Sequence, residues 1–186
     1  MPSDRNYSAF DGPKLVVRGD LATMIRVAKS HLDTHPQAQL LIFDDSTGSQ
    51  VDYDFRGTVA DVLQRYVPEE AEGEPVKGPG RPKLGVVSRE VTLLPRHWEW
   101  LAEQPSGASA TLRRLVDEAR KSEDPALRSR RVTGRVMTVL AGNRPNFEEA
   151  YRALDAGNGH RFESLTEEWP EDVRGYLSAL AADAFE

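Results

Sequence analysis

The stretch from Val67 to Gly85 limits most strongly how this chain can fold, because it interrupts both regular kinds of backbone structure. It holds four prolines and four glycines: Pro68, Gly73, Pro75, Gly78, Pro79, Gly80, Pro82 and Gly85. Proline lacks a backbone donor and glycine weakens helices and strands, so neither element continues through such a segment. We therefore predict a basic linker over residues 67–87, which joins an acidic α/β domain over 1–66 to a second domain over 88–186.

The residues before this linker predict a small α/β unit. Apolar residues favour short strands at Lys14–Val17 and Leu40–Phe43, and alternation of apolar and polar residues predicts another strand at 51–55. Apolar residues at helical spacing follow Asp20, and a second such pattern follows Thr58. Both residues are favourable helix caps, so we expect a helix after each of them.

Beyond the linker, the pattern predicts one strand, Ser88–Leu94, followed only by helices. The expected helices cover 95–104, 109–121, 132–141, 146–157 with an Asn146/Glu149 capping box, 161–167, and a last helix with Pro170 in its first turn. Trp98 and Leu101 share one helical stripe and are expected in a core, whereas Trp100 lies off that stripe. The predicted fold class is α+β: a small N-terminal α/β unit, a Pro/Gly linker, and then one strand followed by a helical bundle.

The charge pattern places a basic block between two acidic ones. The net charge is −6, yet residues 77–135 carry 13 Lys and Arg against 7 Asp and Glu. Residues 1–76 and residues 136–186 each carry six more acidic than basic residues. The phosphate backbone of a nucleic acid responds to such a local field. The alternative is that the basic residues only solvate a helical surface or pair with the acidic flanks.

The segment Gly80–Arg120 resembles ribbon-helix-helix DNA-binding proteins. The features that carry the resemblance are a short strand, a helix, a turn and a basic second helix, marked by Leu94-Pro95, Gly107, Ser109, Arg113 and Arg114. The resemblance implies that two chains pair Ser88–Leu94 into an antiparallel ribbon that enters the major groove, so that the protein is a homodimer. The nucleic-acid contacts that it implies are Arg81, Lys83, Arg89, Ser109, Arg113 and Arg114.

The outward side chains of this ribbon are poor readers of base sequence. Alternate residues of a strand face opposite sides, so one of two sets points toward the DNA. The first set is Arg89, Val91 and Leu93, and the second is Glu90 and Thr92. Sequence is read by hydrogen bonds and apolar contacts to base edges, and neither set offers many donors. The alternative is that the strand-helix-helix segment only packs within the chain or forms a dimer interface.

Two other basic segments are candidates for phosphate contacts. Gly80-Arg81-Pro82 resembles an AT-hook, whose arginine lies in a narrow minor groove, or is only part of a basic, proline-stiffened linker. A further cluster consists of Arg128, Arg130, Arg131 and Arg135. Its members are predicted either to contact phosphates or to pair with Glu123 and Asp124.

Acidic residues and histidines raise the question of an enzyme or a metal site. Four aspartates surround one predicted hairpin: Asp44, Asp45, Asp52 and Asp54. Aspartates that follow a strand can bind Mg²⁺, but residues 45–48 also have the composition of an ordinary turn. His31 and His35 have the i, i+4 spacing of metal ligands, with no evident third ligand. We therefore predict no catalytic residue, no metal and no cofactor.

The composition excludes several classes of protein. The chain contains no cysteine, which rules out disulfides, thiolate-bound zinc and thiol nucleophiles. No apolar run approaches the roughly 18 residues that span a bilayer, and the polar segment Met1–Phe10 lacks the apolar region of a signal peptide. These features predict a cytoplasmic protein that does not enter a membrane.

Three segments together resemble an uncharacterised bacterial family, catalogued as domain of unknown function 2239. They are Asp52–Gly57, Gly80–Leu101, and Asn146–Leu154 with Trp169-Pro170. The resemblance spans nearly the whole chain and implies a cytosolic bacterial protein. It implies no catalytic residue, because the family has no established function.

The sequence thus favours a dimeric DNA-binding protein, a regulator of transcription, over two alternatives. The first alternative is a non-enzymatic protein-interaction module in which the strand-helix-helix segment is only structural. The second is a metal-dependent enzyme that uses the aspartate cluster. The positions of Arg89, Arg113 and Arg114 discriminate among these, because one exposed basic face favours DNA.

Overall fold

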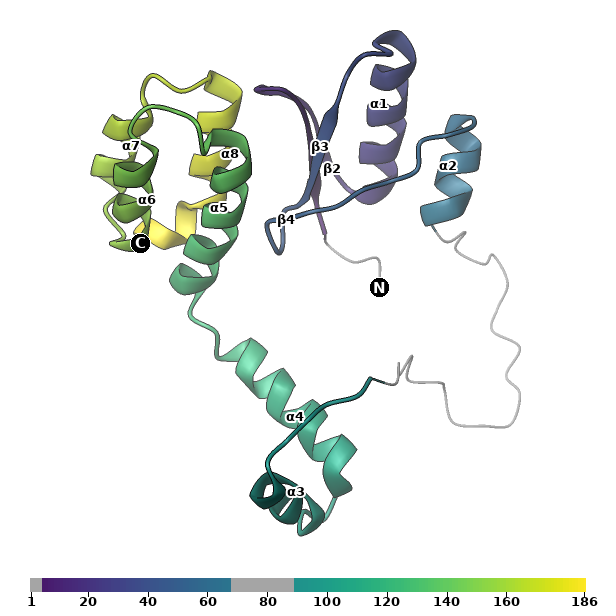
Figure 1. Cartoon of the computed structure of the whole chain (residues 1–186), viewed down its shortest axis with the longest axis vertical. Helices are drawn as coiled ribbons and strands as arrows, with labels where there is room; N and C mark the ends of the chain where they lie inside the picture. The colour runs from purple at the N-terminus through teal and green to yellow at the C-terminus, as the bar shows by residue number, and fades with distance from the viewer. Residues whose placement is uncertain (1–4, 68–88) are drawn as a thin grey trace. The chain divides into compact units, whose positions relative to one another are not determined.

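A computed structural model describes residues 5–67 and 89–186 (Figure 1). The chain divides into two compact units, one made of Met1–Glu70 with Asp124–Glu186 and the other of Ala71–Glu123. We call their described parts the sheet unit (residues 5–67 and 124–186) and the two-helix unit (residues 89–123). This division differs from the expected domains, because the helices after residue 124 belong with the N-terminal strands. Most of the predicted linker lies outside the described residues.

The sheet unit is built on a small antiparallel sheet. Its strands are β1 (Tyr7–Asp11), β2 (Lys14–Gly19), β3 (Leu40–Asp44) and β4 (Ser49–Gln50), in the order β2-β1-β3-β4. The hairpin between β1 and β2 turns at Gly12, whose φ of 56° suits glycine. A bulge between Ala9 and Phe10 shifts the register of this pair. The sequence interpretation did not include β1, although it is a central strand.

Helices cover both faces of this sheet. On one face, α1 (Leu21–Thr34) and α2 (Val59–Tyr66) pack their apolar residues against Ala9 and Ile42. On the other face, Phe10 and Phe43 belong to the core formed with the C-terminal helices. Figure 1 shows α1 and α2 on one side of the sheet and α5–α8 on the other. Adjacent residues of a strand point to opposite faces, so β1 and β3 each contribute to two cores.

The C-terminal helices form the larger of these two cores. They are α5 (Pro125–Ala141), α6 (Phe147–Asp155), α7 (Gly159–Thr166) and α8 (Glu171–Leu180), followed by the 3₁₀ turn η1 (Ala182–Phe185). Phe162, Leu154 and Leu177 are fully or almost fully buried among them. Trp169 is also buried, and its indole Nε1 donates to the Pro145 carbonyl at 2.9 Å. This bond satisfies the one polar atom of a buried tryptophan.

The two-helix unit has little core of its own. It contains α3 (Pro95–Ala102) and α4 (Gly107–Lys121), and Gly107 opens α4 with a φ of 72°. Among residues 89–123, Leu101 and Thr111 are the buried side chains, each 2% exposed. The predicted core position of Trp98 is therefore wrong for the single chain, since this side chain is 43% exposed.

The predicted fold class, α+β, is confirmed, and so are the caps of the first two helices. The Asp20 carboxylate accepts from the Thr23 amide, and Thr58 forms a capping box with Asp61. The capping box at Asn146 is wrong, because this residue has a left-handed φ of 61° and its side chain makes no cap bond. Pro170 precedes α8 as its cap and does not lie in its first turn.

One predicted strand is wrong, and another, which was predicted to pair between two chains, is not formed within the single chain. Residues 51–56 have no regular secondary structure, because side chains of α2 take up their backbone groups: the Tyr66 hydroxyl accepts from the Asp54 amide at 2.8 Å, and Arg65 donates to the Asp54 and Arg56 carbonyls. Residues 89–94 likewise form no strand in this single chain, and Ser88 lies outside the described residues. The alternation of apolar residues in these segments therefore does not by itself create a ladder.

Candidate nucleic-acid interface

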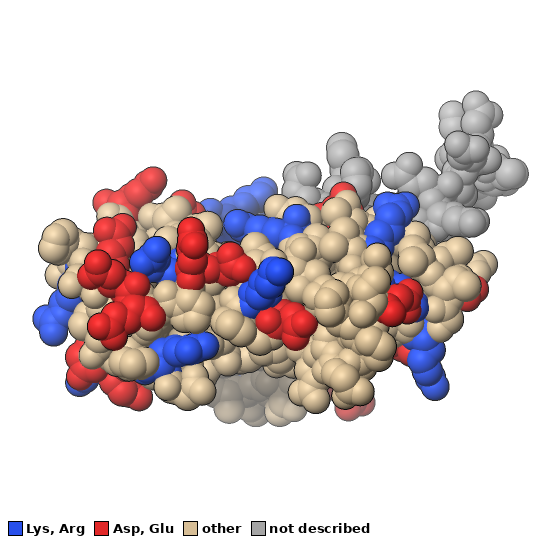
Figure 2. Space-filling view, turned by 90° about the horizontal axis from the view of Figure 1, so that it is seen from above, with Lys and Arg blue, Asp and Glu red and all other residues tan. Residues whose placement is uncertain are grey.

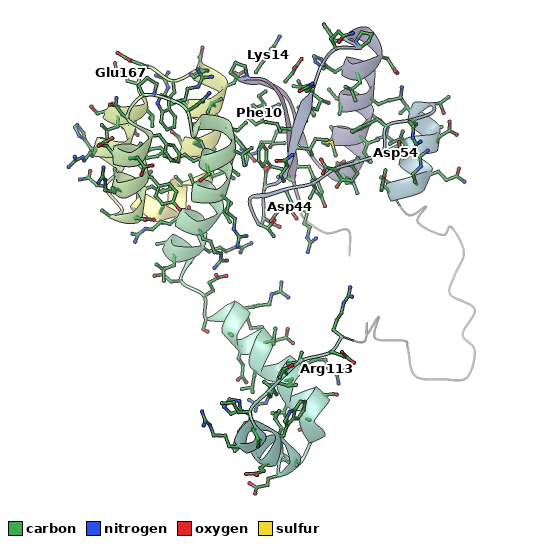
Figure 3. The ribbon with its side chains drawn as sticks, viewed as in Figure 1. Phe10, Lys14, Asp44, Asp54, Arg113 and Glu167 are labelled. Carbon is green, nitrogen blue, oxygen red and sulfur yellow. The ribbon has the colours of Figure 1, made fainter. Side chains whose placement is uncertain are left out.

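The residues predicted to contact nucleic acid fall into two groups. Arg81 and Lys83 lie outside the described residues. Arg89, Ser109, Arg113 and Arg114 are all exposed in the two-helix unit, and Figure 3 labels Arg113 on α4. Because α4 begins at Gly107, Ser109 lies inside the first turn and is not its cap.

One member of the basic pair on α4 is already paired with a carboxylate. Arg114 Nη1 lies 2.9 Å from Glu118 Oε1, one turn further along the same helix. Both side chains are more than half exposed, so the pair contributes little to stability. Arg113 projects from the neighbouring position of the helix and is exposed.

The described part of the two-helix unit is electrically balanced. Residues 89–123 contain six basic residues, Arg89, Arg96, Arg113, Arg114, Arg120 and Lys121, and six acidic ones, Glu90, Glu99, Glu103, Asp117, Glu118 and Glu123. The basic excess of residues 77–135 therefore comes from the segment outside the described residues and from α5. This corrects the expectation that the strand-helix-helix segment itself carries the positive charge.

Exposed apolar side chains distinguish the two-helix unit more clearly than charge does. Six large ones are between 38% and 58% exposed: Val91, Leu94, Trp98, Trp100, Leu115 and Val116. The much larger sheet unit exposes three comparable side chains, Val27, Leu127 and Val139. An apolar surface of this density on so short a segment is typical of an interface. Sequence reasoning missed it, although the count of apolar residues in 91–116 was a usable signal.

The arginines of α5 are the second basic group. Arg128, Arg131 and Arg135 are exposed, whereas Arg130 is partly buried and donates to the carbonyls of Asp155 and Ala184. Arg130 therefore holds the C-terminal segment in place. The predicted helix began at residue 132, but Asp124 caps a helix that starts at Pro125. An Asp-Pro pair of this kind is a recognised start signal and would have placed all four arginines on one helix.

The aspartates near the hairpin do not converge on a common point. Figure 3 places Asp44 near the β3–β4 end of the sheet and Asp54 beside α2. Asp44 Oδ1 accepts from the Ser46 amide and hydroxyl at 2.8 and 2.6 Å, as in an ordinary turn. Asp54 pairs with Arg56, whose hydrogen bonds hold the pKa of this carboxyl below its usual range. Among residues 5–67 and 89–186, no group of three His, Asp or Glu side chains could hold a metal ion.

Asp45 is the aspartate with the most enclosed surroundings. Its side chain is 8% exposed, and Oδ2 accepts from Arg18 Nε at 2.8 Å. Its other oxygen, Oδ1, accepts from the Tyr176 hydroxyl of α8 at 2.7 Å. Burial, and then the charge of Asp45, raise the pKa of Tyr176 above its usual range. These contacts join the sheet to the C-terminal helices, which is a structural role.

The histidine pair on α1 also has structural contacts. His31 Nε2 lies 2.9 Å from Asp11 Oδ2, and the rings of His31 and His35 stack with their centroids 4.4 Å apart. A pocket of about 450 Å³ borders His31, with Lys14, Val16 and Arg26 in its lining. His31 is partly buried and His35 is exposed, so the pair lies at the surface near the C-terminal end of α1.

Acidic side chains dominate the α6–α8 end of the sheet unit. Eight of them are exposed there: Glu148, Glu149, Asp155, Glu163, Glu167, Glu168, Glu171 and Asp172. Figure 2 shows red side chains outnumbering blue ones at this end of the unit. A phosphate backbone is repelled by such a surface, so this end of the unit is unsuited to a nucleic acid.

The fold and these surfaces define the general class of protein to which the chain belongs. The chain is an α+β protein whose distinguishing surfaces are an apolar two-helix unit and an arginine-bearing helix. None of its described helices is long and apolar enough to cross a membrane. Residues 6–181 match the model of DUF2239, described as an uncharacterized protein conserved in bacteria, and the chain belongs to this family. Comparisons with curated proteins and with solved structures found no significant match.

Proposed function

We propose that the two-helix unit pairs with the same unit of a second chain and that the paired units bind duplex DNA, which makes the protein a dimeric DNA-binding regulator. The observation that carries this proposal is the set of six large exposed apolar side chains in the two-helix unit. A unit that encloses so little core is seldom stable without a disulfide, a metal or a partner subunit. The chain has no cysteine, which leaves a partner subunit as the most economical source of stability.

A second copy of the chain suits this surface better than an unrelated partner. Residues 89–94 form no ladder in the single chain, and a two-fold axis lets this segment pair with its own copy in antiparallel fashion. With Arg89 on the outward face of the ribbon, the same pairing covers Leu94, which points to the opposite face and is 49% exposed. The equal numbers of acidic and basic residues in 89–123 also make the unit compatible with its own copy, because neither sign dominates.

Binding to DNA follows from what a paired ribbon presents. Arg89 and Arg113 are exposed, and pairing brings two copies of each to one assembly. The ribbon offers few donors to base edges, so we expect affinity to arise mainly from phosphate contacts and sequence selectivity to be modest. Arg81 and Lys83 precede the ribbon and add two basic residues next to it in the sequence.

One observation favours a second candidate function, a protein-interaction module. The described two-helix unit has no excess of positive charge, whereas most nucleic-acid-binding surfaces are basic. In that case the paired units form a structural dimer, and the protein acts through a protein partner. The two functions share the dimer and differ in the response to DNA.

The dimer is tested by light scattering on the full chain and on two matched variants. Val116→Asp introduces a charge on α4, where the side chain is 56% exposed. Val139→Asp is the control, because Val139 is 44% exposed on α5 of the sheet unit. We expect the wild type and Val139→Asp to be dimers at tens of micromolar and Val116→Asp to be a monomer. A monomeric wild type at that concentration contradicts the dimer.

DNA binding is tested by fluorescence anisotropy of a labelled duplex at several salt concentrations. We expect wild-type affinity to fall steeply with salt and Arg113→Ala with Arg114→Ala to weaken it. The control pair is Arg152→Ala with Arg161→Ala, since both are exposed in the acidic α6–α8 region. Absence of binding at low salt rejects the DNA proposal and leaves the interaction module.

A further inference from the structure

The first turns of α5 carry the largest concentration of positive charge in the described chain. Residues 125–141 contain four arginines and no acidic residue. Arg128 and Arg135 are seven positions apart, which places them on the same face of the helix two turns from each other. Both side chains are exposed. Both belong to the basic cluster for which the sequence left two roles open, phosphate contacts or pairing with Glu123 and Asp124.

The β3–β4 turn lies against this face and orients the two arginines. Arg128 Nη2 lies 3.4 Å from the Ser46 carbonyl oxygen, and Arg135 Nη1 donates to the Thr47 carbonyl at 3.1 Å. Gly48 makes the approach possible, because a Cβ built on it would lie 2.4 Å from the Val132 carbonyl oxygen. Val132 lies between the two arginines along α5. The turn is therefore fixed against the helix, with one guanidinium near each of two successive carbonyls.

These contacts leave the charge of both arginines uncompensated. A carbonyl oxygen is neutral, and a guanidinium has five N–H donors, of which each contact uses one. Within the described residues, neither Arg128 nor Arg135 has an ion pair with a carboxylate. The nearest acidic residues in the turn, Asp44 and Asp45, have side chains that are 10% and 8% exposed. Their carboxylates are engaged by Ser46, Arg18 and Tyr176.

Exposed guanidinium groups with spare donors are well suited to phosphate oxygens. Arginine binds phosphate through charge-assisted and often bidentate hydrogen bonds, which are stronger than bonds between neutral groups. Because Arg128 and Arg135 reach the turn from different turns of α5, a ligand with several phosphates can engage both. In sequence, α4 ends at Lys121 and α5 begins at Pro125. Three residues therefore separate the two helices along the chain.

We propose that Arg128 and Arg135, held by the β3–β4 turn, bind phosphate groups of the nucleic acid that the two-helix unit engages. This inference rests on the proposed function and assigns the main electrostatic contact to α5. It also accounts for the charge balance of residues 89–123, because the positive charge that attracts DNA is carried by a neighbouring element. The two-helix unit then supplies pairing and position, and α5 supplies much of the salt-dependent affinity.

The test compares the salt dependence of duplex binding between full-length variants. Replacing Arg128 and Arg135 by Gln removes both charges and keeps side-chain amide donors for the two carbonyls. The slope of log affinity against log salt is expected to become shallower by about 0.9 for each phosphate that is no longer neutralised, or about 1.8 per chain. Arg128→Lys with Arg135→Lys keeps the charges and is expected to restore most of the slope. Arg152→Gln with Arg161→Gln is the matched control and is expected to leave the slope unchanged.

The outcomes separate this inference from the proposed function. If the wild type does not bind duplex DNA, both proposals fall. If the wild type binds and the Arg128→Gln/Arg135→Gln variant keeps the full slope, the α5 contact is wrong and the two-helix unit retains the binding. Circular dichroism and the thermal midpoint of the variant show whether the sheet unit is intact. If the double variant unfolds, the single variants Arg128→Gln and Arg135→Gln decide the question, because each is expected to lose about 0.9 of the slope.

A further arm distinguishes a nucleic acid from a free anion. Inorganic phosphate is titrated into the wild type and the Gln variant at constant ionic strength, with the thermal midpoint as the readout. If phosphate raises the midpoint of the wild type alone, and the two proteins bind duplex with equal slopes, the site binds a free anion. That result overturns the assignment to nucleic acid.

Discussion

The sheet unit and the two-helix unit use their apolar residues in opposite ways. In the sheet unit, strands β1 and β3 contribute to a core on each face, and Phe10, Phe43 and Val136 are completely buried. In the two-helix unit, Leu101 is the one large apolar side chain that is fully enclosed among residues 89–123. The first unit is stabilised by its own sequence, whereas the second exposes the kind of side chains that a core requires. The burial of apolar side chains therefore distinguishes the two units: the sheet unit forms its own core, and the two-helix unit is suited to assembly with a partner.

The contrast extends to polar contacts between distant parts of the sequence. The sheet unit is joined by bonds such as the one from the Leu15 amide to Asp172 Oδ2 at 2.9 Å, which occupies a donor on the edge strand β2. In the two-helix unit the side-chain bonds are local, as in the Arg114–Glu118 pair. Local bonds stabilise a helix by only a few tenths of a kcal/mol. We therefore expect mutations of comparable size to have very different effects in the two units.

The largest effect is expected for Phe10→Ala. Phe10 is fully buried, and its ring lies 5.1 Å from the ring of Tyr176 between centroids. Truncating a buried phenylalanine typically costs about 3–5 kcal/mol, because transfer energy and packing are both removed. Urea unfolding followed by circular dichroism measures this loss. A loss below about 1 kcal/mol would mean that the C-terminal helices do not share a core with the sheet.

The next effect in size is expected for Gly48→Ala. Its φ of 68° is costly for alanine, and the added Cβ would lie 2.4 Å from a backbone oxygen of α5. Strain of this kind costs on the order of 1–3 kcal/mol. Gly107→Ala is an informative control in the two-helix unit, because its φ is 72° but no atom lies within 4 Å of the new Cβ. Equal losses for the two variants would show that the close approach to α5 is unimportant.

Local signals in the sequence predicted much of the sheet unit but not its long-range pairing. The caps at Asp20 and Thr58 act within three residues of themselves, so their sequence context was sufficient. Strand β1 was missed because its partners, β2 and β3, are needed to recognise five residues of mixed polarity as a strand. The proline- and glycine-rich stretch also suggested that everything after it formed a separate domain. Contacts such as Tyr176 with Asp45, 131 positions apart, cannot be read from local patterns.

The candidate interface shows the same limit. The sequence located a basic block and a strand-helix-helix segment, and Arg89, Arg113 and Arg114 are exposed as a nucleic-acid contact requires. The balance of charge within 89–123 could be counted from the sequence, and the pairing of Arg114 with Glu118 follows helical i, i+4 spacing, but the prediction used only the wider block 77–135. The sequence could not show that the β3–β4 turn lies against Arg128 and Arg135, because these segments are more than 80 positions apart. The segment 51–55 failed for a similar reason, since Tyr66 and Arg65 bind its backbone.

A third effect is expected at alkaline pH for Tyr176→Phe. The pKa of Tyr176 in the folded chain is raised above its ordinary value of 10.0, chiefly by burial. The folded state therefore keeps this proton when the unfolded state releases it, so stability is full below pH 10 and falls as the pH rises above it. One such group contributes a slope of about 1.4 kcal/mol per pH unit. We expect the variant to lose this part of the slope, measured by urea unfolding at a series of pH values above 10.

The same variant also loses the bond to Asp45, which shifts its stability at every pH. That loss, about 1.5–3 kcal/mol for a hydrogen bond to a charged group, is constant near neutral pH and can be subtracted. A wild type and a Tyr176→Phe variant with parallel pH profiles above pH 10 would contradict the enclosed position of the hydroxyl. Tyr53, whose pKa is also raised by burial, remains in both proteins and cancels in the comparison.

The smallest effect on folding is expected for Val116→Ala, and it sharpens the comparison between the units. Val116 is 56% exposed in the single chain, so its truncation should change the unfolding free energy of the sheet unit by less than about 0.5 kcal/mol. If two paired copies bury this side chain, however, the substitution removes about 1 kcal/mol of apolar burial from each copy. The affinity of the dimer then falls by roughly tenfold or more. The variant should therefore alter assembly without altering the sheet unit.

The three tryptophans allow the two units to be followed separately in this experiment. Trp98 and Trp100 lie in the two-helix unit, and Trp169 is buried in the sheet unit. With Trp169→Phe, emission reports the two-helix unit and should shift to shorter wavelength as protein concentration rises, because pairing removes the exposed indoles from water. With Trp98→Phe and Trp100→Phe, emission reports Trp169 and should not depend on concentration. Adding Val116→Ala to the first background should move the shift to higher concentration. An emission maximum independent of concentration in both backgrounds would mean that the apolar surface of the two-helix unit does not pair with its own copy.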